Sequence, residues 1–237
     1  MALPRLNENP QYELVIPSTK EKVNFRPFLV KEQKVLLIAY ESQDRKQILS
    51  AMLNTIDQCI HQQIDVKKLS TFDVDYMFTM IRSKSAGETT TLLFKCKECQ
   101  TENEVVIKLD EIVVDVKERD MRIELTDKIA VKMRYPNYEF FLNNSVLMTE
   151  GKSQSEMLLA SIIGCLEAVE TEDERIDLAD ESEEEVNQFL ESLTGAQFEK
   201  ISQFALELPV MQKNIQYKCK NCGADNERML RGLEDFF

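Results

Sequence analysis

The stretch Lys95-Cys96-Lys97-Glu98-Cys99 recurs late in the chain as Lys218-Cys219-Lys220-Asn221-Cys222. Each copy is followed by an Asn-Glu pair at the same distance, so both read K-C-K-x-C-x-x-x-N-E. A C-x-x-C turn can place two thiolates around one ion, and four sulfur ligands in a tetrahedron suit zinc. The repeat therefore predicts one structural Zn²⁺ per chain. The predicted ligands are Cys96, Cys99, Cys219 and Cys222.

The two halves of this predicted site lie far apart, whereas a conventional zinc module keeps its halves within about 20 residues. A metal ion would hold a late segment against a middle one, and closing so long a loop is where a cross-link stabilises most in theory. Disulfides, a redox pair and unliganded thiols are the alternatives. The lack of a secretory signal pattern disfavours disulfides, and a redox pair does not explain two copies with matching flanks. Four sulfur ligands leave no open position, which predicts a structural and not a catalytic site.

The composition narrows the class of protein. The 237 residues suffice for one large domain or two small ones. No apolar run approaches the length of a membrane span. We find no phosphate-binding glycine-rich loop, nucleophile elbow or H-E-x-x-H motif, and one histidine, His61, excludes most histidine-based catalytic sets. The chain is therefore not expected to be an enzyme. Cys59 and Cys165 lie in apolar, helix-like stretches and are expected to be buried small side chains.

Negative charge is concentrated in one segment. The net charge is −13, and the stretch from Glu167 to Glu191 holds twelve acids against one base, Arg175. So acidic a segment repels nucleic acid and suits a basic protein partner. The plainer interpretation is a solvated acidic loop followed by the start of a helix.

The apolar pattern predicts an α+β fold: a mostly helical body, a four-cysteine zinc ribbon formed by two distant C-x-x-C hairpins, and an extended N-terminal arm. The predicted divisions are 1–30, the extended N-terminal arm; 31–88, a helical segment; 89–136, the first zinc-ribbon hairpin and a β segment; 137–213, a helical segment with the acidic run; and 214–237, the second zinc-ribbon hairpin and C-terminal tail.

Three details of this prediction bear on function. The arm has little reason to fold alone and is expected to lie against something else, such as another chain. The stretch from Ser155 to Val169 is apolar over most of its surface and predicts a central buried helix. The terminal Phe236 and Phe237 are expected to be buried in the ribbon or docked on a neighbouring protein.

Several stretches together resemble the T4-like bacteriophage baseplate hub proteins. The N-terminal part of the resemblance is Leu3-Pro4, Asn9-Pro10-x-Tyr12, Ile16-Pro17-Ser18-Thr19 and Phe25-Arg26-Pro27-Phe28-Leu29-Val30-Lys31-Glu32. The later part is Leu193-Thr194-x-x-Gln197-Phe198-Glu199-Lys200-Ile201, Cys219-x-x-Cys222-Gly223 and Gly232-Leu233-x-x-Phe236-Phe237. The family includes a small hub subunit and a related factor thought to catalyse hub assembly. The resemblance implies a contractile-tail baseplate component made in the host cytoplasm, and it transfers no catalytic residue.

The arm, the acidic segment, the apolar C-terminus and the metal site together fit an assembly part. We expect a structural subunit of the baseplate hub, located in the virion tail baseplate. Its expected partners are other baseplate and tail proteins in a symmetric assembly, with neither nucleic acid nor membrane. One alternative is a transient, chaperone-like assembly factor absent from the virion. Another is a zinc-ribbon nucleic-acid binder, which the lysines of the repeat favour and the pI of 4.7 opposes.

Overall fold

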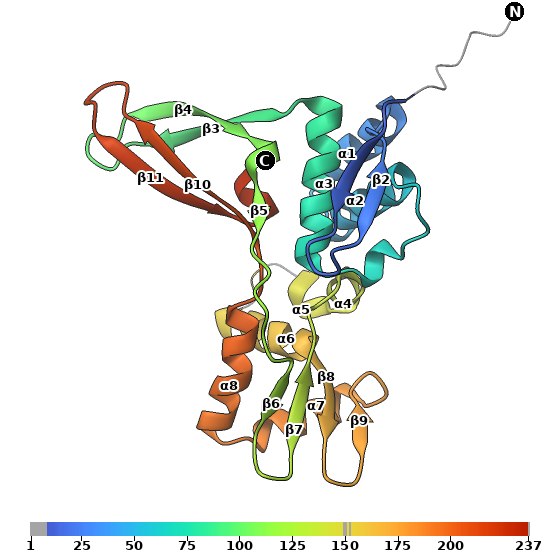
Figure 1. Cartoon of the computed structure of the whole chain (residues 1–237). Helices are drawn as coiled ribbons and strands as arrows, with labels where there is room; N and C mark the ends of the chain where they lie inside the picture. Colours follow the sequence, from blue (N-terminus) through green and yellow to red (C-terminus); the bar gives the residue numbers. More distant parts are fainter. Residues whose placement is uncertain (1–8, 149–150, 152, 237) are drawn as a thin grey trace, which may run out of the picture. The chain divides into compact units, whose positions relative to one another are not determined.

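The computed structural model describes residues 9–148, 151 and 153–236 and shows a mixed α/β chain (Figure 1). The chain forms two compact units. Unit 1 comprises Met1–Val116 and Pro209–Phe237, and unit 2 comprises Lys117–Leu208. Among the described helices, none is both long and apolar enough to cross a membrane.

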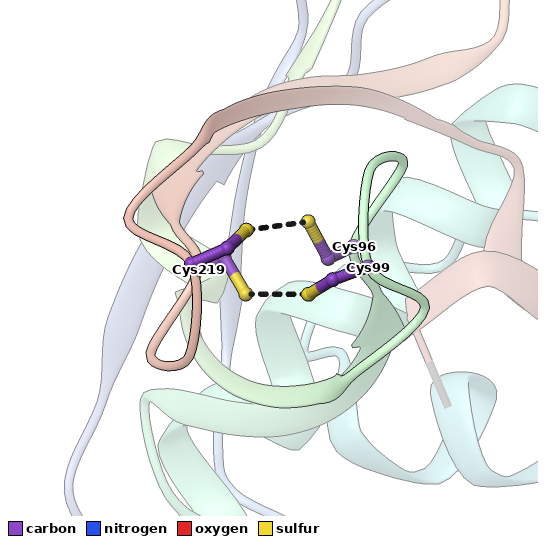
Figure 2. A group of neighbouring side chains, drawn as sticks. Cys96, Cys99 and Cys219 are labelled. Carbon is purple, nitrogen blue, oxygen red and sulfur yellow. Dashed lines mark hydrogen bonds between the residues drawn. The ribbon is translucent and has the colours of Figure 1, made fainter.

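Two β-hairpins of unit 1 carry the cysteine turns at their tips (Figures 1 and 2). The first pairs β3 (Thr89–Lys95) with β4 (Glu102–Lys108), and the second pairs β10 (Met211–Lys218) with β11 (Asp225–Arg231). Short strand β5 (Val113–Val114) pairs with the start of β10. The two hairpins that the repeat predicts are therefore present, with strands longer than the apolar runs alone indicated.

The hairpins share one apolar core with the short helical turns η2 (Leu109–Glu111) and η3 (Leu233–Phe236). The buried members of this core are Phe94, Ile107, Leu109, Ile112, Met211, Ile215, Leu230 and Phe236. Phe236 is fully buried, which confirms the first of the two expectations for this side chain. Phe237 lies outside the described residues.

The N-terminal strands of unit 1 fold against helices of the same chain. Strand β1 (Tyr12–Val15) pairs antiparallel with β2 (Lys22–Phe25), and the inward side chains of this hairpin are buried. Helices α1 (Val30–Glu41), α2 (Arg45–Cys59) and α3 (Thr71–Ala86) follow, with the one-turn η1 (Val66–Lys68) between the last two. The two strands of the expected arm are thus present, and from residue 9 onward they lie against this chain and not against another, because Ile16, Val23 and Phe25 gain burial locally. Residues 1–8 of the arm lie outside the described residues.

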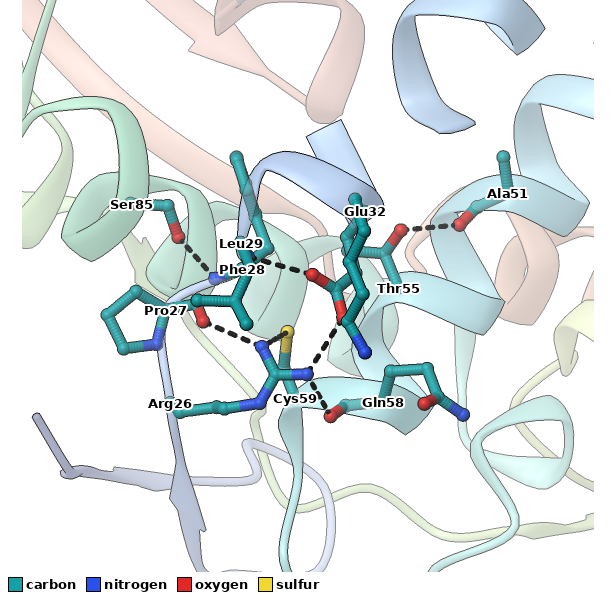
Figure 3. Close-up of polar contacts among 11 residues, drawn as sticks. Arg26, Pro27, Phe28, Leu29, Glu32, Ala51, Thr55, Gln58, Cys59 and Ser85 are labelled. Atoms are coloured by element: carbon teal, nitrogen blue, oxygen red, sulfur yellow. Dashed lines mark hydrogen bonds and ion pairs between the residues drawn. The ribbon is translucent and has the colours of Figure 1, made fainter. Parts of the chain in front are cut away.

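A buried charge pair fixes the start of α1 (Figure 3). One nitrogen of the Arg26 guanidinium lies 2.8 Å from Glu32 Oε1 and donates to the Gln58 carbonyl at 2.9 Å. The other carboxylate oxygen of Glu32 accepts from the backbone N–H of Leu29 at 2.8 Å. Glu32 thus satisfies a backbone donor before the first turn of α1 while its charge is neutralised by Arg26.

The residues between Arg26 and Glu32 join this start to two other helices. Arg26 also donates to the Pro27 carbonyl at 2.9 Å, and its backbone N–H donates to the Cys59 carbonyl of α2. The backbone N–H of Phe28 donates to Ser85 Oγ of α3 at 2.9 Å. The stretch from Phe25 to Glu32 therefore fixes where α1 begins and which face it turns inward.

Unit 2 is a four-stranded antiparallel sheet with helices. The strand order is β6 (Arg122–Glu124), β7 (Ala130–Met133), β8 (Leu166–Glu170) and β9 (Arg175–Asp177). Its helices are α4 (Tyr138–Asn143), α5 (Ser145–Met148), α6 (Gln154–Cys165), α7 (Glu183–Glu191) and α8 (Gly195–Leu206). The buried core comprises Leu125, Val131, Met133, Ile162, Cys165, Leu166, Val186, Leu190, Ile201 and Phe204.

The predicted helix from Ser155 to Val169 is wrong in its last turn. Helix α6 ends at Cys165, and the next five residues form β8, an inner strand between β7 and β9. A short apolar run suits a buried helix or a buried strand, and here pairing on both sides decides for the strand. Gly164, in the last turn of α6, leaves room for the ring of Phe140, because a Cβ there would lie 2.5 Å from a carbon of that ring.

We predict that Glu32→Ala lowers the free energy of unfolding by about 3 kcal/mol, because it leaves the Arg26 guanidinium buried without its partner. Chemical denaturation at neutral pH measures this change. Glu13→Ala is the matched control, since Glu13 forms an exposed ion pair with Lys22 and should cost at most about 1 kcal/mol. Equal losses in the two variants would contradict a structural role for the buried pair.

The same pair should make stability depend on pH in acid. Burial raises the pKa of Glu32, but the hydrogen bonds from Arg26 and Leu29 outweigh burial and leave it lowered. A lowered folded-state pKa stabilises the fold above the unfolded value of about 4.3. This contribution should be lost as the pH falls through the lowered value, and Glu32→Gln should remove this part of the acid dependence of stability.

Candidate metal centre

The two cysteine turns have the same backbone structure. In the first turn, Cys96 N donates to Thr101 O at 3.0 Å and Gln100 N donates to Cys96 O at 3.0 Å. In the second, Cys219 N donates to Ala224 O at 2.9 Å and Gly223 N donates to Cys219 O at 3.0 Å. The residue after the second cysteine is left-handed in both, with φ of 59° at Gln100 and 70° at Gly223. The sequence repeat is therefore also a structural repeat.

The turns bring the four predicted ligands together. The sulfur atoms of Cys96, Cys99, Cys219 and Cys222 all lie within 4.8 Å of one another. Across the two turns, Cys96 Sγ lies 3.7 Å from Cys222 Sγ, and Cys99 Sγ lies 3.5 Å from Cys219 Sγ (Figure 2). A tetrahedral ion with sulfur ligands at about 2.3 Å needs sulfur atoms about 3.8 Å apart. The four thiols fit one such ion, and their chemistry suits a soft or borderline metal.

Two buried asparagines exchange hydrogen bonds between the turns. Asn103 belongs to the first repeat, yet its Oδ1 accepts from Lys220 N of the second turn at 2.8 Å. Asn226 of the second repeat accepts in the same way from Lys97 N at 2.9 Å. Each asparagine also points its amide nitrogen at the first cysteine of the opposite turn. Asn103 Nδ2 lies 3.7 Å from Cys219 Sγ, and Asn226 Nδ2 lies 3.5 Å from Cys96 Sγ.

These asparagines hold the four cysteine side chains in their orientation. Their side chains are nearly inaccessible, with 3% exposure for Asn103 and 4% for Asn226. N–H groups directed at sulfur stabilise thiolates, and such supporting contacts hold ligands in the geometry a metal requires. The sequence motif could have identified these asparagines, because Asn stands at the same position in both repeats. What the sequence did not show is that each asparagine serves the opposite turn.

The thiols differ in acidity. The Thr101 hydroxyl, 3.3 Å from Cys99 Sγ, is the largest cause that lowers the pKa of Cys99 to about 6. The pKa of Cys96 is also lowered, chiefly by the backbone N–H of Cys99. For Cys222, the Ala224 backbone N–H lowers the pKa, but neighbouring cysteines outweigh it and raise it to about 12. Without a cation, the group therefore favours some thiolates and keeps at least one thiol protonated.

The other two cysteines stand apart from this group, as expected. Cys59 ends α2 and Cys165 ends α6, and both side chains are fully buried. Burial raises the pKa of Cys59 to about 11 and that of Cys165 to about 12. Inert, protonated thiols are the result.

The acidic segment, residues 167–191, is built into the sheet of unit 2 and is more than a loop. It spans β8, β9 and α7. Arg175 binds Glu167 at 2.6 Å and Asp177 at 3.0 Å within the segment. Bases from β6 and the β6–β7 region add further pairs, as between Arg122 and Glu170 at 2.8 Å. Helix α7 begins with three glutamates, which the helix dipole favours. Part of the negative charge is thus neutralised by the fold.

Known proteins place the chain in a family. Residues 9–237 match the model of the family described as T4 bacteriophage base plate protein. The chain belongs to this family, which confirms the resemblance seen in the sequence.

One curated relative is similar over nearly its whole length. The chain is 25% identical over 228 residues to the baseplate hub assembly protein gp26 of Enterobacteria phage T4, covering 96% of this chain and 98% of the relative. No solved structure matches the chain.

We predict that Asn103→Ala and Asn226→Ala lower the free energy of unfolding by similar amounts, about 1–3 kcal/mol each, because each variant leaves one backbone N–H of the opposite turn without its acceptor. Chemical denaturation of the metal-loaded protein measures the loss. The control is Asn221→Ala, whose exposed Nδ2 also lies near a cysteine sulfur, 3.8 Å from Cys99 Sγ. A loss of about 0.5 kcal/mol or less is expected there, which separates the backbone contacts of the buried asparagines from a contact with sulfur alone. A large effect at one buried asparagine and none at the other would contradict the exchange between turns.

Proposed function

We propose that this protein acts in the assembly of the baseplate hub of a contractile-tailed bacteriophage, as a structural subunit in the tail baseplate that works through protein–protein contacts. Similarity to a hub assembly protein along both chains supports the role in hub assembly. Assembly would occur in the host cytoplasm, where reduced thiols are available to a metal.

The surface of unit 1 supports a role in protein contacts. Helix α1 exposes several large apolar side chains, among them Ile38 at 67% and Tyr40 at 73%. Concentrated apolar exposure of this kind marks interaction sites on soluble proteins. This helix begins in the Phe25–Glu32 stretch that carries part of the family resemblance. We therefore propose other baseplate proteins as partners, and neither nucleic acid nor membrane.

We also propose that the four cysteines bind one structural Zn²⁺. Four sulfur ligands at these separations suit zinc and complete its tetrahedron, so no position remains for substrate. Four thiolates and one Zn²⁺ carry a formal charge of −2, which Lys95, Lys97, Lys218 and Lys220 would offset locally. An enzymatic role has no support from this site, and we propose that the protein is not an enzyme.

A transient assembly factor is the second candidate, and the name of the phage T4 relative favours it. Quantitative mass spectrometry of purified mature tails separates the two candidates. A structural subunit should be present at a fixed copy number in every preparation. Absence from tails together with abundance in the lysate of infected cells would replace the structural role with that of an assembly factor. Strong retention on DNA resin at low salt would instead support the nucleic-acid alternative.

Zinc content tests the metal proposal. Protein purified under reducing conditions without chelators should contain about one zinc per chain. Cys96→Ser and Cys219→Ser should lower zinc content and stability to the same extent, because each breaks the same tetrahedron. Cys165→Ala is the control and should keep its zinc, since Cys165 is outside the group. Absence of zinc in the wild-type protein would overturn the assignment. Acid should release the metal, because the ligands bind as thiolates.

A further inference from the structure

Helix α1 exposes most of the large apolar side chains that a surface helix ordinarily buries. The side chains it buries are Glu32 and Ala39, while its large apolar residues face solvent. The exposed fractions are 66% for Val30, 50% for Val35, 55% for Leu37, 67% for Ile38 and 73% for Tyr40. A single exposed apolar residue is normal, but five on one twelve-residue helix require an explanation.

The orientation of α1 is fixed by charge, so these apolar side chains cannot turn inward. Rotating the helix to bury Leu37 and Ile38 would withdraw Glu32 from Arg26 and from the Leu29 N–H. Leaving that guanidinium buried without a partner would be more unfavourable than burial of one or two aliphatic side chains is favourable. The fold therefore presents this face to the outside.

The residues of this face follow helical spacing. Val30, Lys34, Leu37, Ile38 and Glu41 stand at i, i+4, i+7, i+8 and i+11, and we call them the α1 face. Two charges of opposite sign flank the apolar centre. Lys31 already contacts Glu32 at 3.3 Å, whereas no ion pair joins Lys34 or Glu41 to another side chain in the described part of the chain.

We propose that the α1 face binds the α1 face of a second copy of this chain, with the two helices antiparallel about a twofold axis between Leu37 and Ile38. The axis brings together the apolar centres of both helices. Lys34 and Glu41 lie equally far from this axis along the helix, so Lys34 of each copy faces Glu41 of the other. An interface of this kind is self-complementary, as a twofold axis requires.

The charge pattern selects this arrangement over a parallel one. Parallel helices in register would set Lys34 against Lys34 and Glu41 against Glu41, which repel. In the antiparallel arrangement each Lys34 lies opposite a Glu41, and the two pairs attract. The two helix dipoles also point in opposite directions, which is favourable for neighbouring helices. One short helix offers less than the standard interface of about 800 Å² per partner, so the dimer should be weak, with a dissociation constant of about 1–100 μM.

Sedimentation velocity of the full-length, metal-loaded protein between about 1 and 200 μM tests the proposal, and a monomer–dimer equilibrium is expected. Ile38→Asp should weaken dimerisation at least about tenfold, because it buries a negative charge from each copy at the apolar centre of the interface. Leu206→Asp is the matched control, since Leu206 is 70% exposed on α8 of unit 2 and should leave the equilibrium unchanged.

A charge exchange tests the antiparallel pairing itself. Lys34→Glu and Glu41→Lys should each weaken the dimer, because each places like charges opposite each other. The double variant K34E/E41K should restore the wild-type constant, because the pairs reappear with their signs exchanged. All these side chains are exposed, so each variant should unfold at the same temperature as the wild-type protein. Thermal melting of each variant therefore serves as the check that it folds.

Three outcomes would overturn the proposal: a wild-type protein that stays monomeric at every concentration, a dimer insensitive to Ile38→Asp, or a double variant that dimerises no better than the single ones. If the monomeric wild type enters tails and Ile38→Asp does not, the α1 face binds another protein. Dimerisation is measured on the isolated protein, so its result is independent of whether the baseplate role holds.

Discussion

The exchange of hydrogen bonds between the two cysteine turns is the constraint on which the two-hairpin part of unit 1 depends. Asn103 and Asn226 each belong to one turn and complete the other, so neither turn has its full set of contacts alone. The four sulfurs converge only when both turns are in place. The apolar core beneath the turns combines side chains of both hairpins with Phe236 near the C-terminus. The late segment is therefore a structural partner of the middle one.

A second fixed point is the pair Arg26 and Glu32, which acts elsewhere in unit 1. This ion pair and the asparagines of the cysteine turns have one property in common. Each is a buried polar group whose hydrogen bonds are satisfied by neighbouring residues. The consequence differs. The cysteine turns close a core, whereas Arg26 and Glu32 hold a helix with its apolar side outward. The fold therefore leaves large apolar side chains of α1 exposed that a rotated helix would bury. Exposed apolar side chains of this kind are typical of binding surfaces.

The sequence predicted those features of the fold that depend on the pattern of nearby residues. The K-C-K-x-C-x-x-x-N-E repeat located the four cysteines and both hairpins, and the burial of Cys59 followed from its apolar surroundings. The sequence failed where distant contacts decide. Leu166 to Glu170 form a strand because β7 and β9 lie on either side, and an apolar run cannot show its neighbours. The outward face of α1 was missed for a similar reason, because Glu32 is turned inward by Arg26 and not by any periodicity.

The pairing of β5 with β10 has a consequence for how the chain is put together. Val114 and Met211 are opposite one another in this pairing, so the chain leaves unit 1 and returns to it at neighbouring positions. Unit 2 is thus inserted into the connection between two paired strands. Insertion at such a position disturbs the surrounding domain little. Synthesis proceeds from the N-terminus, so every residue of unit 2 is added to the chain before Cys219 and Cys222. The four cysteines can therefore come together only near the end of the protein's own production.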